Sequence, residues 1–444
     1  MQRDRFGVQP LFWNTTPTSV RISPSIDALL AAGVPAELDD AAMAVFLRIG
    51  FFVGDDTPFA AIRALPAAGA ISWTPGRGAA TDGSWRYPRR SDISRSAAVD
   101  RFADCFTAAI ERGLRQATDP VVVPLSGGHD SRHILLAMHS LGRLPDHCVT
   151  VHPYPPAAAD EVAVATTVAA ALGVRHVLLR QREHRVAAER EKNVLTHYCS
   201  DEHVQFMPLR DYFSRRPFEV FDGLAGDVLS QSQRLDASLH RDFVEGRFEP
   251  AAERILGDAQ SIEPALARLL TRRAAARFTR PLAVSRLAGE IARHADAPNP
   301  IAGFFFFSRM RREVALAPYG VLDICPVSTP FLDADLVDLM LSLPFAVVAD
   351  RTLHTETLHR RYPAWAHLPF DGKRKGQEDT RGVRRSAAAL LALALRSRSA
   401  MIDTAAIAAR AARTLVSGVS AHVWFLPRMV QLLDVERRYI EFTD

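Results

Sequence analysis

The sequence predicts an α/β fold in which a doubly wound parallel sheet follows a shorter β-rich region and precedes a helical C-terminal part. Short, β-branched apolar runs at residues 121–125, 149–151 and 177–179 alternate with helical patterns. Strands that alternate with helices lie parallel, because each helix carries the chain back across the sheet. Ligands of such sheets bind at the carboxyl ends of the strands.

The N-terminal region has the pattern of a small β-rich unit. The stretch from residue 75 to residue 90 is rich in Gly, Pro and Arg, which favours a linker. We therefore predict one unit over residues 1–90 and a second over residues 95–444. The elements expected in the first unit are strands at residues 12–13 and 20–22, helices at residues 26–32 and 41–49, and a turn with a strand at residues 62–73.

Helical patterns dominate the remainder of the chain. An amphipathic pattern predicts a helix over residues 97–116, before the first strand of the parallel sheet, and an Ala-rich helix is expected over residues 158–172. Residues 235–320 are also expected to be helical. The aromatic run at residues 304–307 is predicted to be core. We interpret the tail from residue 386 onward as packing only.

Composition and charge exclude several classes of protein. The chain has 444 residues, of which 48% are hydrophobic and 23% charged, as in globular proteins. The formal net charge of +4 is small, so a nucleic-acid surface is weakly supported. No run of 18 apolar residues is present, so no membrane segment is expected. The four cysteines lie far apart and form no CxxC pair, which fits a reducing cytoplasm.

A glycine-bearing loop follows the first strand of the predicted sheet. Ser126, Gly127 and Gly128 come directly after the strand, and a helical pattern begins near Asp130. Free N–H groups at a helix start attract anions, and glycines let an anion approach the backbone. A carboxylate in the first helical turn can hold a metal against a phosphate. The Walker A pattern is absent, so this is a different kind of anion-binding loop.

The stretch SGGHDS, from Ser126 to Ser131, resembles the pyrophosphate-binding loop SGGxDS of ATP pyrophosphatases of the asparagine synthetase type. The resemblance implies that ATP and Mg²⁺ are the cofactors and that Val151 frames the adenine. For the motif alone, the alternative is a strand-to-helix turn that needs two glycines. The ATP-binding residues implied for this loop are Leu125, Ser126, Gly127, Gly128, Asp130 and Ser131.

A second loop, VFDGLAGDVLS at residues 220–230, again combines an apolar run, glycines and acids. It resembles the family's [ST]GEGxDE loop. The resemblance implies that Asp222 and Gly223 line ATP and that Asp227 shares Mg²⁺ with Asp130. Two carboxylates suit Mg²⁺, which takes few protein ligands and completes its shell with phosphates. The alternative is that Asp227 is a turn or cap residue.

Three positions depart from the family pattern. Leu224 stands where asparagine synthetases have a glutamate and β-lactam synthetases a tyrosine, and Val228 replaces an acid. Leucine cannot exchange a proton, so these departures question asparagine synthesis itself but not ATP binding. Residues 329–344 resemble the family's PFLD segment, and Ser328 replaces the arginine before it, which we expect to affect substrate choice.

The glycine-flanked segment at residues 368–376 contains three cations. In relatives, a lysine in such a loop steadies the adenylate transition state and the leaving pyrophosphate, which is electrostatic catalysis by a fixed cation. The resemblance implies a catalytic role for Lys375 first and for Lys373 second. The alternative is a solvated run of charges.

The N-terminal residues resemble the second half of the family's glutaminase domain. Residues 3–11, RDRFGVQPL, match its RDRxGxxPL strand and turn, and residues 57–66 match its TPFxxIxxLP segment. Glutamine hydrolysis there needs a cysteine at the mature N-terminus. The chain begins with Met1, and its first cysteine is Cys105. We therefore expect a truncated, structural remnant without glutaminase activity; a misplaced start is the alternative.

Together these segments imply an ATP-dependent, AMP-forming amide-bond synthetase that resembles asparagine synthetase and is cytoplasmic. A small-molecule or peptide carboxylate would be adenylated and then captured by ammonia or an amine, with ammonia possibly supplied by a separate glutaminase chain. No nucleic acid or membrane is expected as a partner. One alternative is a biosynthetic-cluster tailoring enzyme of the β-lactam synthetase or lasso-peptide cyclase kind. Another is a non-catalytic nucleotide-binding scaffold.

Overall fold

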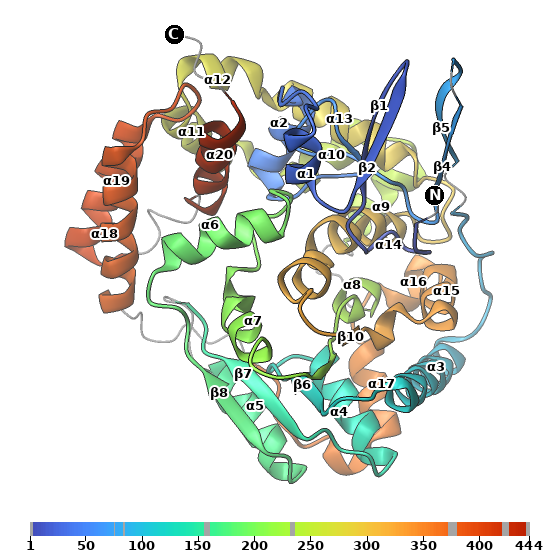
Figure 1. Ribbon diagram of the computed structural model, residues 1–444. Coiled ribbons are helices and arrows are strands. Elements are labelled where there is room, and N and C mark those ends of the chain that lie inside the picture. Colours follow the sequence, from blue (N-terminus) through green and yellow to red (C-terminus); the bar gives the residue numbers. More distant parts are fainter. Residues whose placement is uncertain are drawn as a thin grey trace.

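The computed structural model describes residues 3–74, 76–82, 85–154, 160–230, 236–371, 380–419 and 426–440. A five-stranded sheet forms the lower half of the molecule (Figure 1). Its strands are all parallel and lie in the order β10-β9-β6-β7-β8. The predicted α/β class is therefore confirmed. The strands are β6 (Val121–Pro124), β7 (His147–Val151), β8 (His176–Leu179), β9 (Glu219–Phe221) and β10 (Val327–Ser328).

The order of the strands creates a switch point beside β6. The chain passes from β6 through β7 to β8 on one side, and then returns to place β9 on the other side of β6. Connections that leave neighbouring strands in opposite directions open a crevice between them at the carboxyl edge. The two glycine-bearing loops follow β6 and β9, so the sheet order brings them together.

Helices cover both faces of the sheet. Alternate residues of β6 belong to different cores, with Val123 in one and Val122 in the other. The face of the sheet that carries Val123 packs with helices α3, α4 and α5, whereas the face that carries Val122 packs with α7. This alternation follows from the strand period of two and explains the uniformly apolar strands. The helices are α3 (Arg95–Gln116), α4 (Asp130–Ser140), α5 (Asp160–Ala171), α6 (Arg185–Leu195) and α7 (Met207–Phe213).

The N-terminal region forms a three-stranded antiparallel sheet, two helices and a hairpin. The hairpin corrects one prediction, because its second strand lies inside the stretch expected to be a linker. Gly76 and Gly78 both have positive φ, 77° and 78°, and the Arg77 N–H donates to the Thr74 carbonyl, which closes the turn. The elements are β1 (Phe12–Thr16), β2 (Ser19–Ser23), α1 (Ile26–Ala31), α2 (Asp40–Ile49), β3 (Arg63–Ala64), β4 (Ala70–Thr74) and β5 (Gly78–Asp82).

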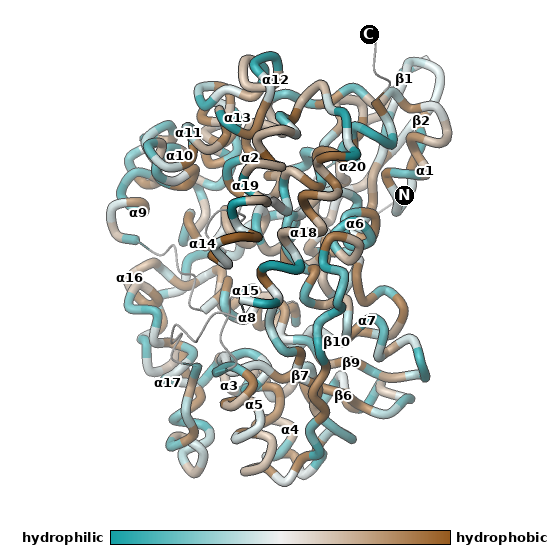
Figure 2. The backbone as a smooth tube through the Cα atoms, turned by 90° about the vertical axis from the view of Figure 1, so that its left-hand side faces the viewer, coloured by the Kyte–Doolittle hydropathy of each residue, from teal (hydrophilic) through white to brown (hydrophobic). Residues whose placement is uncertain are grey.

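The N-terminal region shares a continuous core with the rest of the chain. Arg311, which is buried, donates to the Gly54 and Leu65 carbonyls and pairs with Asp55. Arg48 likewise forms an ion pair with Glu263. Figure 2 shows the N-terminal elements in the upper half of the molecule, above the sheet. These buried arginine contacts hold the N-terminal region against the rest of the chain, because breaking one would leave a buried charge without a partner.

Helices form the remainder, as predicted, and Phe304–Phe307 are all buried. A π-helix, η2 (Phe306–Val314), follows α14. In the described residues, no helix is long and apolar enough to cross a membrane. The helices are α8 (Gly226–Ser230), α9 (Ala237–Val244), α10 (Phe248–Leu256), α11 (Ala259–Leu269), α12 (Arg272–Arg277), α13 (Arg280–Ala292), α14 (Pro300–Phe305), α15 (Ala334–Ser342), α16 (Phe345–Val348), α17 (Leu353–Arg361), α18 (Thr380–Arg396), α19 (Thr404–Ser417) and α20 (Leu426–Tyr439).

Candidate functional site

A cavity of about 560 Å³ opens at the carboxyl edge of the sheet, at the switch point beside β6. It collects residues from both glycine-bearing loops and from β7, which lie far apart in the sequence. Gly127 and Gly128 are not part of its lining. The predicted site residues that do line it are Leu125, Ser126, Asp130, Ser131, Val151, Asp222, Gly223 and Asp227.

The loop after β6 is held by its own hydroxyl groups. The Ser126 N–H donates to Ser131 Oγ at 2.9 Å, and the Gly128 N–H donates to Ser126 Oγ at 3.2 Å. The loop therefore closes onto the first turn of α4 and presents Asp130 at the helix start. Both serines of the motif thus shape the loop as well as line the cavity.

Gly127 lies in a crowded position between two acidic residues. A Cβ atom at Gly127 would lie 2.8 Å from Asp371 Cβ and 3.3 Å from Glu161 Cα, so only glycine fits. The Gly127 carbonyl accepts from the Asp371 N–H at 3.1 Å. Burial and the nearby Asp371 raise the pKa of Glu161, while the Gly127 N–H bonded to its carboxyl opposes that shift. The Glu161 carboxylate thus accepts a hydrogen bond from a backbone amide of the loop that is predicted to bind an anion.

Asp130 and Asp227 meet directly across the switch point. The Asp227 N–H donates to Asp130 Oδ2 at 3.0 Å, and Asp130 Oδ1 is buried without a hydrogen-bond partner among the described residues. A Cβ at Gly223 would lie 2.8 Å from Asp130 Cβ, and a Cβ at Gly226 would lie 2.5 Å from its carboxyl carbon. The glycines of the second loop therefore admit the carboxylate of the first. The backbone of Asp227 and the carboxylate of Asp130 are thus in direct contact, and both residues line the cavity.

The acids of this cavity repel one another. Burial, followed by the neighbouring Asp227, raises the pKa of Asp130 well above its usual value. Burial raises the pKa of Asp222 to about 6, although its carboxylate accepts from the Leu224 N–H at 2.8 Å. Buried carboxylates without nearby cations are costly, and a divalent ion would remove that cost. Among the described residues, no group of three metal-ligating side chains is present, so a cation here would need further ligands from phosphate or water.

Replacing Asp222 by Asn should stabilise the protein without nucleotide at pH 7.5, by about 1–3 kcal/mol. Because the folded-state pKa of Asp222 lies above that of an unfolded chain, the ionised carboxylate destabilises the fold above pH 6. The gain should shrink steadily between pH 6 and 4, as the folded wild type takes up its proton. Urea unfolding across this pH range measures it. The exposed Asp296→Asn serves as a matched control, and an equal gain at every pH would contradict the prediction.

A row of buried histidines supports Asp130 from behind. His354 Nδ1 lies 3.5 Å from Asp130 Oδ1 and donates to Ser230 Oγ at 3.0 Å, because the Ser230 hydroxyl itself donates to the Gly226 carbonyl. His354 Nε2 therefore accepts from His133 Nδ1 at 3.0 Å. Burial lowers the pKa of both imidazoles, so the row is neutral. This contact could not be predicted from sequence spacing, since His354 and Asp130 are 224 residues apart.

The two predicted lysines, Lys373 and Lys375, lie outside the described residues. The described chain just before them is anchored at the first loop. Arg132 donates to the Leu368 and Pro369 carbonyls, and its guanidinium lies over the Phe370 ring at 3.9 Å. Together with the bond from Asp371 to Gly127, these contacts fix the point from which residue 372 continues.

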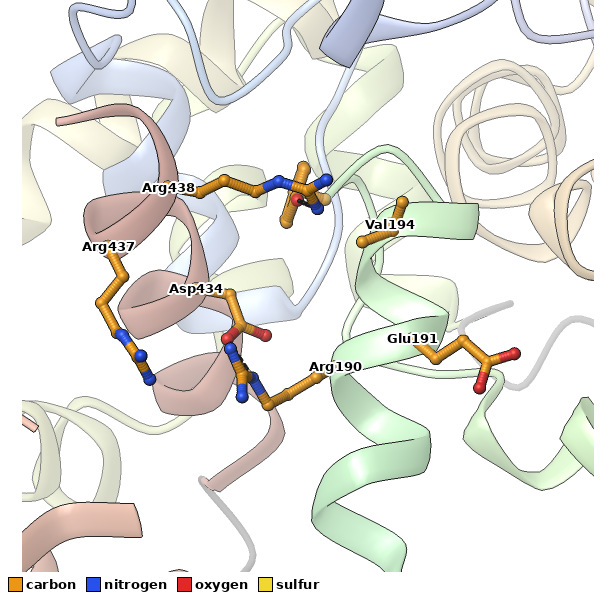
Figure 3. Close-up of a pocket in the computed structure, with 7 residues that line it drawn as sticks. Arg190, Glu191, Val194, Asp434, Arg437 and Arg438 are labelled. Carbon is orange, nitrogen blue, oxygen red and sulfur yellow. Dashed lines mark hydrogen bonds and ion pairs between the residues drawn. The ribbon is translucent and has the colours of Figure 1, made fainter. Parts of the chain in front are cut away.

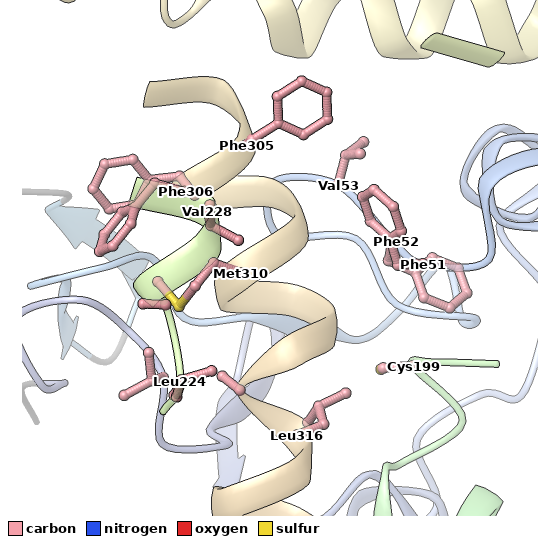
Figure 4. Close-up of a cluster of buried hydrophobic side chains, with 14 of the residues drawn as sticks. Phe51, Phe52, Val53, Cys199, Leu224, Val228, Phe305, Phe306, Met310 and Leu316 are labelled. Atoms are coloured by element: carbon pink, nitrogen blue, oxygen red, sulfur yellow. The ribbon is translucent and has the colours of Figure 1, made fainter. Parts of the chain in front are cut away.

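Leu224 and Val228, the two apolar departures in the second loop, are buried. Figure 4 shows both among hydrophobic side chains that include Phe306 and Met310 of η2. The second loop thus packs onto the π-helix through these residues. Their apolar character is explained by this packing, whereas Asp227 between them faces the cavity.

Several polar residues of the cavity wall were not predicted from the sequence. Gln181, Glu202, His203 and Arg309 all line it. They come from loops and from η2, where no periodic pattern marks them. Two lining residues other than glycine, His203 and Ala225, have positive φ values of 83° and 77°. Strained backbone of this kind gathers at functional sites, but it becomes visible only in the structure.

A second cavity, of about 370 Å³, lies between α6 and α20 (Figure 3). Three of its charged lining residues make polar contacts with other residues of the same lining. Arg190 pairs with Asp434 at 2.6 Å, and Arg438 donates to the Tyr198 hydroxyl at 2.9 Å. None of the predicted site residues lines it. We therefore place the candidate site at the carboxyl edge of the sheet.

Two family models of known proteins match parts of the chain. Residues 1–85 match the family model of the glutamine amidotransferase domain, and residues 101–208 match that of asparagine synthase. The second match includes the loop after β6, whereas Asp222, Gly223 and Asp227 lie beyond it. No curated protein matches the chain. The matches support a synthetase of the ligase class. The chain is thus similar to the asparagine synthetase family over residues 101–208, and it carries a short N-terminal region similar to a glutamine amidotransferase domain.

Proposed function

We propose that the protein is an ATP-dependent, AMP-forming amide-bond synthetase. The observation that carries the proposal is the direct meeting of Asp130 and Asp227 at the switch point of the sheet. A cation held by these two acids would neutralise the charge that develops when a substrate carboxylate attacks the α-phosphorus of ATP. Mg²⁺ is the ion that fits an oxygen-only pair completed by phosphates.

The nucleotide would lie along the cavity from β7 to the first loop. Val151 lies at the end of β7 in the cavity wall, where it would flank the adenine, and Ser126 follows the neighbouring strand β6 and lines the same cavity. The pyrophosphate would take the place of the Glu161 carboxylate at the Gly127 amide. This exchange suits an anion site, because one acceptor replaces another without leaving the amide unpaired.

Lys373 and Lys375 would supply the cation that steadies the adenylate and the leaving pyrophosphate. Support for this role comes from Asp371, which hydrogen-bonds to Gly127 only two residues before Lys373. Two residues span at most about 7 Å. A lysine that contacted a phosphate at the first loop would act as a fixed cation and stabilise the negative charge that develops there.

We further propose that the nitrogen reaching the acyl-adenylate is not released from glutamine by this chain's thiols. Burial raises the pKa of all four cysteines, to about 12 for Cys148 and about 11 for Cys199 and Cys325. A thiol nucleophile needs a lowered pKa and an adjacent base. The nitrogen would then come from free ammonia, an amine or a partner chain.

ATP–pyrophosphate exchange tests the proposal. The full chain with Mg²⁺–ATP should incorporate labelled pyrophosphate into ATP when the correct acid is present, across a panel of aspartate, other amino acids and peptide acids. Glutamine in place of ammonium chloride should give no amide product. Exchange with an acid other than aspartate would favour a tailoring enzyme, for which Leu224 at the family's glutamate position is the specific argument. Tight ATP binding without exchange for any acid would contradict the proposal and favour a scaffold.

A further inference from the structure

One wall of the cavity presents hydrogen-bond acceptors that have no donors. The wall is formed by Glu202, His203 and Gln205 from one turn and by Gln181, whose Nε2 donates to the Gln205 carbonyl at 3.5 Å. This bond leaves Gln181 Oε1 as an acceptor, and it is buried without a partner among the described residues. We call these four residues the acceptor wall.

His203 contributes the second unpaired acceptor. Its side chain is 2% exposed, and its Nε2 lies 2.8 Å from the Glu313 carbonyl. A carbonyl only accepts, so Nε2 carries the proton. Burial lowers the pKa of His203 to about 3, so the ring is neutral and its Nδ1 has a free lone pair. Nδ1 has no partner in the described part of the chain, although it is buried.

Glu202 contributes a negative charge to the same wall. In the described residues, its carboxylate forms no ion pair within 4 Å, whereas the nearby Arg309 is engaged with Glu313 at 3.0 Å. Burial, followed by the neighbouring Asp201, raises the pKa of Glu202. Arg309 and Arg428 oppose this rise in pKa, and Glu202 as a whole residue is exposed. The carboxylate is therefore available to a ligand in the cavity.

The turn that carries Glu202 and His203 has a strained backbone. His203 has a φ of 83°, a conformation that side chains other than glycine rarely adopt. The Glu202 N–H donates to Ser200 Oγ at 3.1 Å, which fixes the turn just before it. A strained residue with an unpaired acceptor in the wall of a cavity is expected where a ligand supplies the missing donor.

We propose that the acceptor wall binds a primary ammonium group of the reactants, with the Glu202 carboxylate as its counter-ion. An ammonium group offers three N–H donors and a positive charge, which match one carboxylate and the two unpaired acceptors. This inference rests on the proposed function, because it assigns chemistry to the same cavity. The ammonium belongs either to the acid that is adenylated or to the protonated form of the attacking amine, which must lose a proton to a base before it attacks.

Matched pairs of probes test the inference. Binding of each probe to the full chain is measured by ligand-observed NMR at pH 7.5 with Mg²⁺ and α,β-methylene ATP. The pairs are L-aspartate with succinate, 6-aminohexanoate with hexanoate, and n-butylamine with n-butanol. At least one amine should bind about 10-fold more tightly than its partner, and Glu202→Gln should reduce that preference to within twofold. A preference in the acid pairs assigns the ammonium to the acid, and a preference in the last pair assigns it to the attacking amine.

Two variants and one independent measurement make the test decisive. Glu183→Gln removes the same charge from an exposed neighbouring position outside the cavity and should keep the preference. Gln181→Leu removes one acceptor and should weaken the preference by a smaller factor than Glu202→Gln. Equal binding within all three pairs, or a preference that survives Glu202→Gln, overturns the inference. The affinity for the nucleotide analogue alone reports separately on the proposed function.

Discussion

Asp130→Asn should lower ATP–pyrophosphate exchange by at least about 100-fold. The substitution keeps an oxygen that can accept from the Asp227 N–H, which lies 3.0 Å from Asp130 Oδ2. It removes the charge that would hold a cation between the two acids. The loss should therefore appear in the chemical step and in the Mg²⁺ dependence of nucleotide binding. Initial exchange rates at a series of Mg²⁺ concentrations measure both.

The same variant should fold at least as well as the wild type. Burial and Asp227 raise the pKa of Asp130, so its ionised form opposes folding at neutral pH. Asparagine removes this cost, and the melting temperature without Mg²⁺ should stay the same or rise. Asp296→Asn, an exposed change of the same kind, should leave exchange unaltered. If Asp130→Asn catalysed exchange at the wild-type rate, the metal assignment would be wrong, because turnover would then not need the charge of Asp130.

Gly226→Ala should reduce exchange by about 10-fold to 100-fold through a steric effect. A Cβ at this position would lie 2.5 Å from both the carboxyl carbon and Oδ1 of Asp130. Since the helix backbone cannot move freely, the carboxylate must rotate away from the Asp227 N–H. The geometry of the two acids would be lost while both remain in the chain. Exchange rates and the affinity for Mg²⁺–ATP measure this effect.

Gly289 provides the matched control for that substitution. It lies in α13, and no atom would lie within 4 Å of a Cβ placed there. Gly289→Ala should raise the free energy of unfolding by about 0.5–1 kcal/mol, because alanine loses less backbone entropy in a helix. It should leave exchange unchanged. If Gly226→Ala also left exchange unchanged, the close approach of the two loops would have no role in the reaction.

Local sequence determined much of the sheet and of its first loop. β-branched runs form strands because their side chains suit a pleated surface, and paired glycines mark the turn before α4. Asp130 could be predicted as a site residue from its position at the helix start alone. The burial of Phe304–Phe307 could be predicted from their hydrophobicity. The β4–β5 hairpin was missed because its glycines resemble those of a linker until a partner strand is present.

The order of the strands, and with it the site, was decided by tertiary structure. Spacing along the chain does not say that β9 returns beside β6, and this return brings Asp227 to Asp130. The acceptor wall and the contact from His354 to Asp130 likewise join segments whose local sequences do not indicate that they are neighbours in space. Propensity and turn chemistry act over a few residues, so the sequence by itself specified the elements and the loops. Burial, strain and the repulsion between acids arise only when distant segments pack, so the structure alone determined which side chains face the cavity and what charge they need there.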